Sequence, residues 1–113
     1  CGFIKSRKLI MENQNQSIFI FAKWQVKDGN LQTVLSLLPS LVEKSTSEEG
    51  NIFYKIYQDN SDSNILILNE SYKDMASIEA HKNSEHYQEI AVKQIIPLLE
   101  NREVILASEL DLG

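Results

Sequence analysis

The sequence predicts an α+β fold in which an antiparallel sheet carries two helices on one face. Four segments are rich in β-branched and aromatic residues, which favour strands, and two others repeat apolar residues every three or four positions, as amphipathic helices do. Their order along the chain is β-α-β-β-α-β, the ferredoxin-like arrangement. The 113 residues fit one domain of this kind.

The first part of the chain predicts one strand and one long helix. Apolar side chains alternate along residues 17–26, as in a strand. Residues 28–30 form a turn that can cap a helix, and residues 30–48 show helical periodicity. We expect Pro39 to kink or split this helix, because proline removes a backbone donor, and Gly50 to end it.

The middle of the chain predicts an antiparallel hairpin. Residues 51–58 and 65–72 both have the composition of strands, and the polar loop 59–64 that joins them is short.

The last part of the chain predicts a divided helix and a final strand. A first helical segment covers residues 75–82, and Ser84 can cap a second segment that reaches about Ile96. Pro97 ends this segment, and residues 102–110 form the last strand.

Two predicted strands are apolar on both faces. Residues 18–21 and 65–68 contain no polar side chain, whereas a sheet with one face in water alternates more regularly. We therefore expect a second copy of the chain to cover the second face, which makes the protein a homodimer.

Composition excludes several classes of partner. The formal net charge of -5 argues against nonspecific binding to nucleic acid or anionic membranes, which needs clustered Lys and Arg. The single cysteine, Cys1, excludes an internal disulfide and a CxxC motif. No apolar run approaches the ~20 residues of a membrane span, and no Gly-rich phosphate loop occurs. We expect no cofactor, no nucleic-acid partner and no membrane span.

Two interpretations of the N-terminus stay open. Met11 precedes a polar run, so residues 1–10 can be an appendage to a cytoplasmic protein that starts at Met11. Alternatively, Cys1 is the acylated first residue of a lipoprotein, and the polar run is its tether. Both interpretations make residues 1–16 a tail or tether and residues 17–113 the folded domain.

Glu70 is a candidate proton carrier. It shares one face of its predicted strand with Leu66 and Leu68, and burial without a partner raises the pKa of a carboxyl group. The alternative, which the sequence alone favours, is a carboxylate at the strand end that is solvated or forms an ion pair with a cation such as Lys55 or Arg102.

His81 is the second candidate. It follows Ile78 by three positions, so it can face the sheet and act as an acid or base near neutral pH. The alternative is a structural hydrogen bond. His86 lies roughly 140° further around a continuous helix, so the two residues do not form the i, i+4 pair of a metal site. We predict no metal site from this spacing.

Four aromatic side chains with polar tips can line a pocket for a planar organic molecule: Trp24, Tyr54, Tyr72 and Tyr87. The alternative for most of them is packing in the core or an interface.

One order of residues carries a family resemblance. A Glu and a Gly end the first helix, a Tyr lies on the second strand, a Glu on the third, and an apolar residue, a His, a Ser and an aromatic residue follow. These are Glu48 or Glu49 with Gly50, Tyr54, Glu70, Ile78, His81, Ser84 and Tyr87. The pattern resembles the antibiotic biosynthesis monooxygenase family, whose members include small quinol monooxygenases. Tyr72 stands where the family has a Trp.

The resemblance implies a dimeric α/β barrel with a cavity between sheet and helices. It also implies oxygenation of a quinol or similar small aromatic substrate by O₂, without metal or flavin. On this reading His81 is the base or orients the substrate, and Glu70 is its partner or holds the pocket. The side chains of Tyr54, Tyr72, Trp24 and Tyr87 contact the substrate.

Other functions stay open within the same fold. Haem-degrading relatives use an Asn on the first strand, where this chain has Ala22, Lys23 and Trp24, so haem degradation is a minor alternative. A small-molecule isomerase and a non-enzymatic dimeric module for small-molecule binding or stress response are the others.

Overall fold

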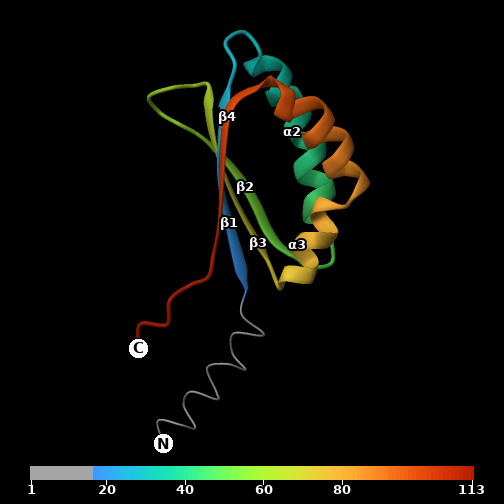
Figure 1. Cartoon of the computed structure of the whole chain (residues 1–113), viewed down its shortest axis with the longest axis vertical. Helices are drawn as coiled ribbons and strands as arrows, with labels where there is room; N and C mark the ends of the chain where they lie inside the picture. The colour runs from blue at the N-terminus through green and yellow to red at the C-terminus, as the bar shows by residue number, and fades with distance from the viewer. Residues whose placement is uncertain (1–16) are drawn as a thin grey trace, which may run out of the picture.

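A computed structural model describes residues 17–113 and confirms the ferredoxin-like prediction. One antiparallel sheet in the order β2-β3-β1-β4 carries the helices on a single face (Figure 1). The strands are β1 (Ile18–Val26), β2 (Asn51–Gln58), β3 (Ile65–Tyr72) and β4 (Leu99–Ala107). The helical elements are α2 (Leu31–Thr46), α3 (Met75–Lys82), the π-helix η1 (Tyr87–Ile95) and the 3-10 turn η2 (Ile96–Leu98). The predicted tail, residues 1–16 with Cys1, lies outside the described residues.

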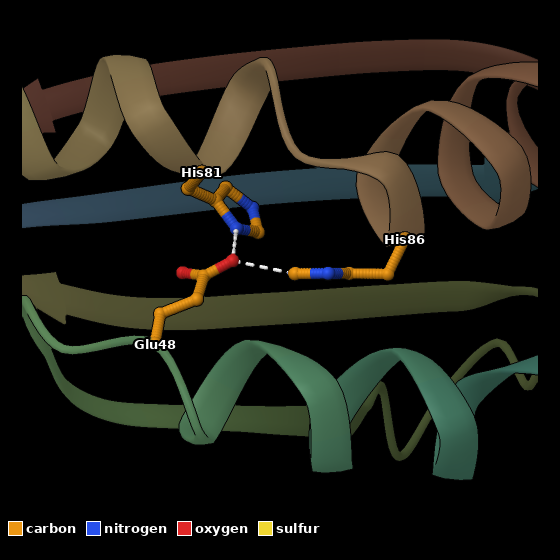
Figure 2. Close-up of side chains that lie close together, drawn as sticks. All are labelled: Glu48, His81 and His86. Carbon is orange, nitrogen blue, oxygen red and sulfur yellow. Dashed lines mark hydrogen bonds and ion pairs between the residues drawn. The ribbon is translucent and has the colours of Figure 1, made fainter.

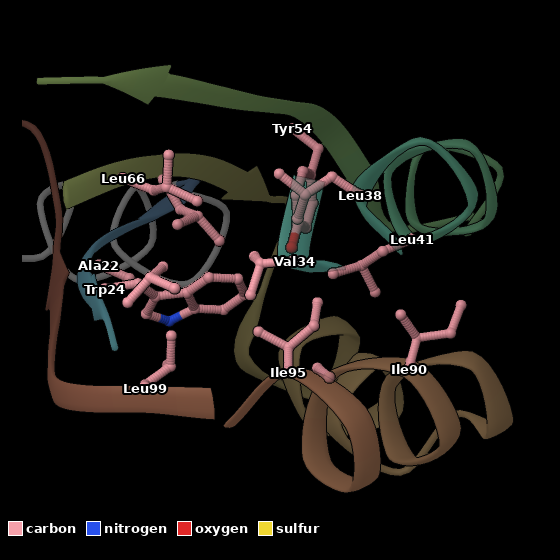
Figure 3. Close-up of a cluster of buried hydrophobic side chains, with 13 residues drawn as sticks. Ala22, Trp24, Val34, Leu38, Leu41, Tyr54, Leu66, Ile90, Ile95 and Leu99 are labelled. Atoms are coloured by element: carbon pink, nitrogen blue, oxygen red, sulfur yellow. The ribbon is translucent and has the colours of Figure 1, made fainter. Parts of the chain in front are cut away.

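The core lies between the sheet and the helices. Alternation along β1 turns Ala22, Trp24 and Val26 toward the helices, where they are buried. Val34 and Leu41 of α2 meet Ile95 of η1 in the same cluster (Figure 3). Burial of each large aliphatic side chain contributes about 1.5–3 kcal/mol, so this cluster holds α2 and η1 against the sheet.

Several sequence predictions need correction. The helix α2 runs through Pro39 as one element, so it is not split. The left-handed conformation that commonly ends a helix at glycine is not found at Gly50, and α2 ends earlier, with Ser47 as its C-cap. The last strand begins at Leu99, directly after the η2 turn, and stops at Ala107, so the prediction of 102–110 was displaced.

The second helical segment differs from the α-helix that its sequence pattern predicted. Ser84 caps it as expected, because its Oγ accepts a hydrogen bond from the Tyr87 N–H at 3.2 Å. The segment η1 then adopts π geometry, in which the Ile96 N–H bonds to the Ala91 carbonyl five residues earlier. This wider turn buries Ala91 and Ile95 together.

Within residues 17–113, no helix combines the length and the hydropathy that a membrane crossing requires.

Candidate active site

Glu48 reaches the interior because the chain passes very close to α3 at Gly50. A Cβ atom at Gly50 would lie 1.9 Å from the Ser77 Oγ, so only glycine fits there without a shift. The Lys73 N–H donates to the Gly50 carbonyl at 2.9 Å and ties this loop to the end of β3. The close approach aims Glu48 inward and leaves Glu49 exposed.

His81 is almost fully buried in the middle of the site, with 3% of its surface exposed. Asp74 begins its helix by accepting hydrogen bonds from the Ser77 N–H at 2.8 Å and the Ser77 hydroxyl at 2.7 Å. The Nδ1–H of His81 donates to Oε2 of Glu48 at 2.8 Å. Its other nitrogen, Nε2, lies 3.8 Å from Oε1 of Glu70, so the ring stands between two carboxyl groups.

His86 contacts the same carboxylate oxygen from the turn before η1. Its Nε2–H donates to Oε2 of Glu48 at 2.5 Å (Figure 2). The two histidines come together because the first helix ends at Lys82 and a new helical segment begins after Ser84 in a different direction. The angle of roughly 140° expected for a continuous helix therefore does not apply, and the sequence prediction that separated the two histidines was wrong.

Glu70 is buried on the helix-facing side of β3, as predicted. No ion pair joins it to Lys55 or Arg102 among the described side chains, and the basic side chain in contact range is His81. Burial raises the pKa of Glu70 to about 8, and the neighbouring Glu48 carboxylate adds to this effect, while a hydrogen bond from Tyr72 opposes it. Glu70 is therefore mainly protonated at neutral pH.

The ring of His81 is held neutral by its surroundings. Burial lowers the pKa of His81, whereas the hydrogen bond and the charge of Glu48 work in the opposite direction and His86 adds a smaller decrease. Since Nδ1–H donates to Glu48, the neutral ring carries a lone pair on Nε2. A carboxylate that fixes the tautomer in this way prepares the second nitrogen to accept a proton.

A cavity of about 300 Å³ lies beside this ring, between the sheet and α3. The volume is at the lower end of the ~300–1,000 Å³ typical of small-ligand pockets. Glu70, His81 and three predicted aromatic residues line it: Trp24, Tyr54 and Tyr87. The ring centroids of Tyr87 and His81 are 4.9 Å apart.

Tyr72 lies beside Glu70 but does not border the cavity. It is fully buried and is not among the residues that line the cavity; its hydroxyl donates instead to Oε1 of Glu70 at 3.5 Å. Burial raises the pKa of both Tyr54 and Tyr72, so these phenols act as hydrogen-bond donors and not as bases.

Glu48 and His86 are the site residues that sequence reasoning missed. Both occur in the resemblance or next to it, but linear spacing assigned no role to either. Each of Glu48, His81 and His86 offers one atom that could bind a metal ion. These three atoms, a carboxylate oxygen and two ring nitrogens, lie within 4.8 Å of one another. They come from three different elements, so spacing within one helix could not identify the group.

Comparison with known proteins gives a consistent result. The family model described as "Antibiotic biosynthesis monooxygenase" matches residues 17–93. The Bacillus subtilis protein named "Putative monooxygenase YcnE" is 32% identical over 76 residues, which are 67% of this chain and 80% of that protein.

Solved structures agree with this fold. A conserved protein from Methanosarcina mazei has a TM-score of 0.77 at 32% identity and covers 86% of this chain and 96% of its own. The protein PA3566 from Pseudomonas aeruginosa has a TM-score of 0.80 at 26% identity and covers 87% of this chain and 98% of its own.

Proposed function

The chain belongs to the antibiotic biosynthesis monooxygenase family, and we propose that it is a cofactor-independent monooxygenase acting on a quinol or a similar small aromatic substrate. The observation that carries this proposal is the position of His81. Its Nδ1–H is held by Glu48 at 2.8 Å while its ring borders a cavity lined by aromatic side chains.

The chemistry begins with a proton. A hydroquinone bound in the cavity gives a phenolic proton to Nε2 of His81, and the resulting anion is electron-rich enough to reduce O₂. One oxygen atom enters the ring and the other leaves as water, so hydroquinone and O₂ become hydroxyquinone and water. The substrate supplies all the electrons, and the reaction balances without an external reductant.

The other site residues orient the substrate and keep water out. Trp24, Tyr54 and Tyr87 provide flat surfaces and donor groups on the cavity wall. Glu70 is protonated at neutral pH, so the carboxyl group beside Nε2 is neutral. It therefore does not repel the substrate anion. Tyr72 positions Glu70 through its hydroxyl.

We also propose that the protein works as a homodimer. The sheet face without helices carries Phe21 and Ile105, which are paired across β1 and β4 and are 43% and 59% exposed. Phe19 and Phe53 lie beside each other on the same face, with ring centroids 6.1 Å apart. A second chain would remove these apolar groups from water. A cytoplasmic location is part of this proposal.

Oxygen consumption tests the proposed function. The purified protein, stripped of metal by a chelator, is supplied with a panel of hydroquinones, and O₂ uptake is recorded. We expect uptake that falls by roughly 100-fold or more in His81→Ala, since general-base catalysis contributes about 10²–10⁴-fold. Glu89→Gln, which alters an exposed carboxylate on η1, is the control and should keep full activity.

Activity that does not depend on the proposed site would overturn the proposal. Full activity in both His81→Ala and Glu70→Gln would show that the chemistry occurs elsewhere. No uptake with any hydroquinone would favour the isomerase or the binding module, and circular dichroism of each variant excludes misfolding as the cause.

A further inference from the structure

Glu48, His81 and His86 form a convergent cluster of metal-ligand side chains. The turn after α2, the last turn of α3 and the turn before η1 each contribute one residue, and all three point toward one another (Figure 2). One carboxylate oxygen, Oε2 of Glu48, lies 2.8 Å from Nδ1 of His81 and 2.5 Å from Nε2 of His86. We call these three residues the His-Glu cluster.

The donor set and its dimensions suit a divalent transition cation. Two imidazoles and one carboxylate are the protein ligands of several zinc and non-haem iron sites, with bonds of about 2.0–2.2 Å. Bonds of this length place neighbouring donor atoms about 3.0–3.5 Å apart in tetrahedral or octahedral geometry. To admit the ion, each of the two observed nitrogen–oxygen distances must therefore lengthen by about 1 Å or less. We propose that the His-Glu cluster is a binding site for a divalent first-row transition cation.

Two further observations support a ligand at this position. The second oxygen of Glu48, Oε1, is buried and has no hydrogen-bond partner, so it can accept a metal ion as the second oxygen of a bidentate carboxylate. On the other side of His81, Oε1 of Glu70 lies 3.8 Å from Nε2. Histidines that bind metals usually donate their second N–H to a carboxylate, and a small movement of Glu70 would bring it within hydrogen-bond distance of Nε2.

Access to the cluster comes from the surface. Glu48 and His81 border a second hollow of about 450 Å³, where Asp74 and Glu49 add two carboxylates and Lys73 adds one ammonium group. The cation can enter from this hollow without passing through the cavity. The metal site would use Nδ1 of His81, whereas the proposed substrate site uses Nε2 of the same ring.

The simpler interpretation is a cluster held by hydrogen bonds alone. Two N–H groups donate to Oε2 of Glu48, and both rings are satisfied without an ion. This interpretation leaves Oε1 of Glu48 buried and unpartnered. If the cluster is held by hydrogen bonds alone and binds no cation, the proposed metal site is wrong.

Metal binding has a consequence for the proposed reaction, and this consequence rests on the proposed function. A neutral imidazole that gives the lone pair of Nδ1 to a cation carries its proton on Nε2. The proton of His86 likewise moves to its Nδ1. With Nε2–H directed toward Glu70, His81 can donate but cannot accept a proton from a substrate. Bound metal should therefore inhibit oxygen uptake.

The binding experiment uses zinc chloride and isothermal titration calorimetry on the full chain after chelator treatment. Every sample carries Cys1→Ser, since a free thiol also binds zinc. We expect one equivalent of zinc per chain with micromolar or tighter affinity. Glu70→Gln should weaken binding by roughly 10- to 100-fold, as loss of an outer-shell partner does. Glu48→Gln and His86→Gln should weaken it more than this. Glu89→Gln, the exposed control, should leave it unchanged.

Cobalt provides a second readout that does not depend on heat or activity. Cobalt(II) bound by two imidazoles and a carboxylate gives visible absorption bands that report its geometry, and these bands should disappear in His86→Gln. The site is overturned if zinc does not bind at millimolar concentration, or if binding and spectrum survive in both Glu48→Gln and His86→Gln. Circular dichroism confirms that the variants are folded.

The metal site and the proposed function can fail separately. Zinc binding that depends on the His-Glu cluster, in a protein that consumes no oxygen, would keep the site and reject the function. Oxygen uptake that depends on His81, in a protein that binds no zinc, would do the reverse.

Discussion

The two ends of the layer between the sheet and the helices are built in opposite ways. Around Val34, the space is filled by aliphatic side chains such as Leu41 and Ile95, which are fully buried as Val34 is (Figure 3). Near His81, the same layer holds two histidines and the carboxylate of Glu48 (Figure 2). It also holds the carboxyl group of Glu70 and a cavity. The first end supplies packing energy, whereas the second buries polar groups that cost free energy to desolvate.

The difference indicates a division of labour. Burial of apolar surface is the main favourable contribution to folding, so the Val34 end can stabilise the domain without help. The His81 end depends on particular contacts, namely the close approach at Gly50 and the caps at Asp74 and Ser84, to hold its polar groups in position. Substitutions at the two ends should consequently differ in kind as well as in size.

The largest expected effect on stability comes from the apolar end. Leu41→Ala removes a fully buried side chain and leaves a cavity, which typically costs 2–5 kcal/mol, so we expect a loss of about 3 kcal/mol in the free energy of unfolding. Urea denaturation measures it. Leu110→Ala, at a side chain that is 76% exposed, should change stability by less than about 0.5 kcal/mol. Equal losses in the two variants would contradict the assignment of the core.

Gly50→Ala should damage both stability and the His-Glu cluster. The new methyl group collides with Ser77, and overpacking of this kind costs about 1–3 kcal/mol. Because Gly50 directs Glu48 toward His81, zinc affinity should fall as well. Calorimetry and urea denaturation measure the two effects.

Two comparison variants sharpen this prediction. Adding Ser77→Gly to Gly50→Ala removes the side chain in the way and should restore zinc affinity. Gly29→Ala places a side chain at a φ of 87° with open space around it, so it should cost about 1–2 kcal/mol of stability without changing zinc affinity. Unaltered zinc affinity in Gly50→Ala would show that the close approach does not position Glu48.

The smallest expected effect concerns the helix cap at Asp74. Hydrogen bonds from Ser77 lower the pKa of Asp74. A carboxyl group whose pKa is lowered by folding adds stability above its unfolded pKa of about 3.9 and loses this contribution as the pH falls further. Asp74→Asn should therefore melt slightly below the parent protein at pH 6, and the difference should shrink at pH 3.

Thermal unfolding followed by circular dichroism measures this change. Asp111→Asn, near the end of the chain, is the control and should behave as the parent protein does at both pH values. A difference between Asp74→Asn and the parent that grows toward low pH would contradict the sign of the pKa shift.

Much of the fold was predictable because local patterns determined it. Alternation along β3 correctly placed Glu70 on the buried face, and the apolar spacing around Ile78 correctly turned His81 inward. The end of α2 was harder, because the role of Gly50 comes from contact with Ser77, which lies 27 residues away in the sequence, and not from its own backbone angles.

The site was predictable only in part, for the same reason. His86 lies beside His81 because Ser84 caps a new helical segment after α3 has ended. A helical-wheel argument holds only within one continuous helix. The π geometry of η1 has no simple signature in the apolar pattern. Glu48 and Glu49 are equivalent in the sequence, and the fold alone distinguishes the inward residue from the exposed one.

The most direct test of this account is the tautomer of His81 in the metal-free protein. The chain contains 2 histidines, so long-range proton–nitrogen NMR spectra of the ¹⁵N-labelled protein can be assigned with the single variant His86→Gln. We predict that Nδ1 of His81 carries the proton and that Nε2 is unprotonated. A proton on Nε2 in place of Nδ1 would mean that Glu48 does not orient the ring, and the proposed base would be absent.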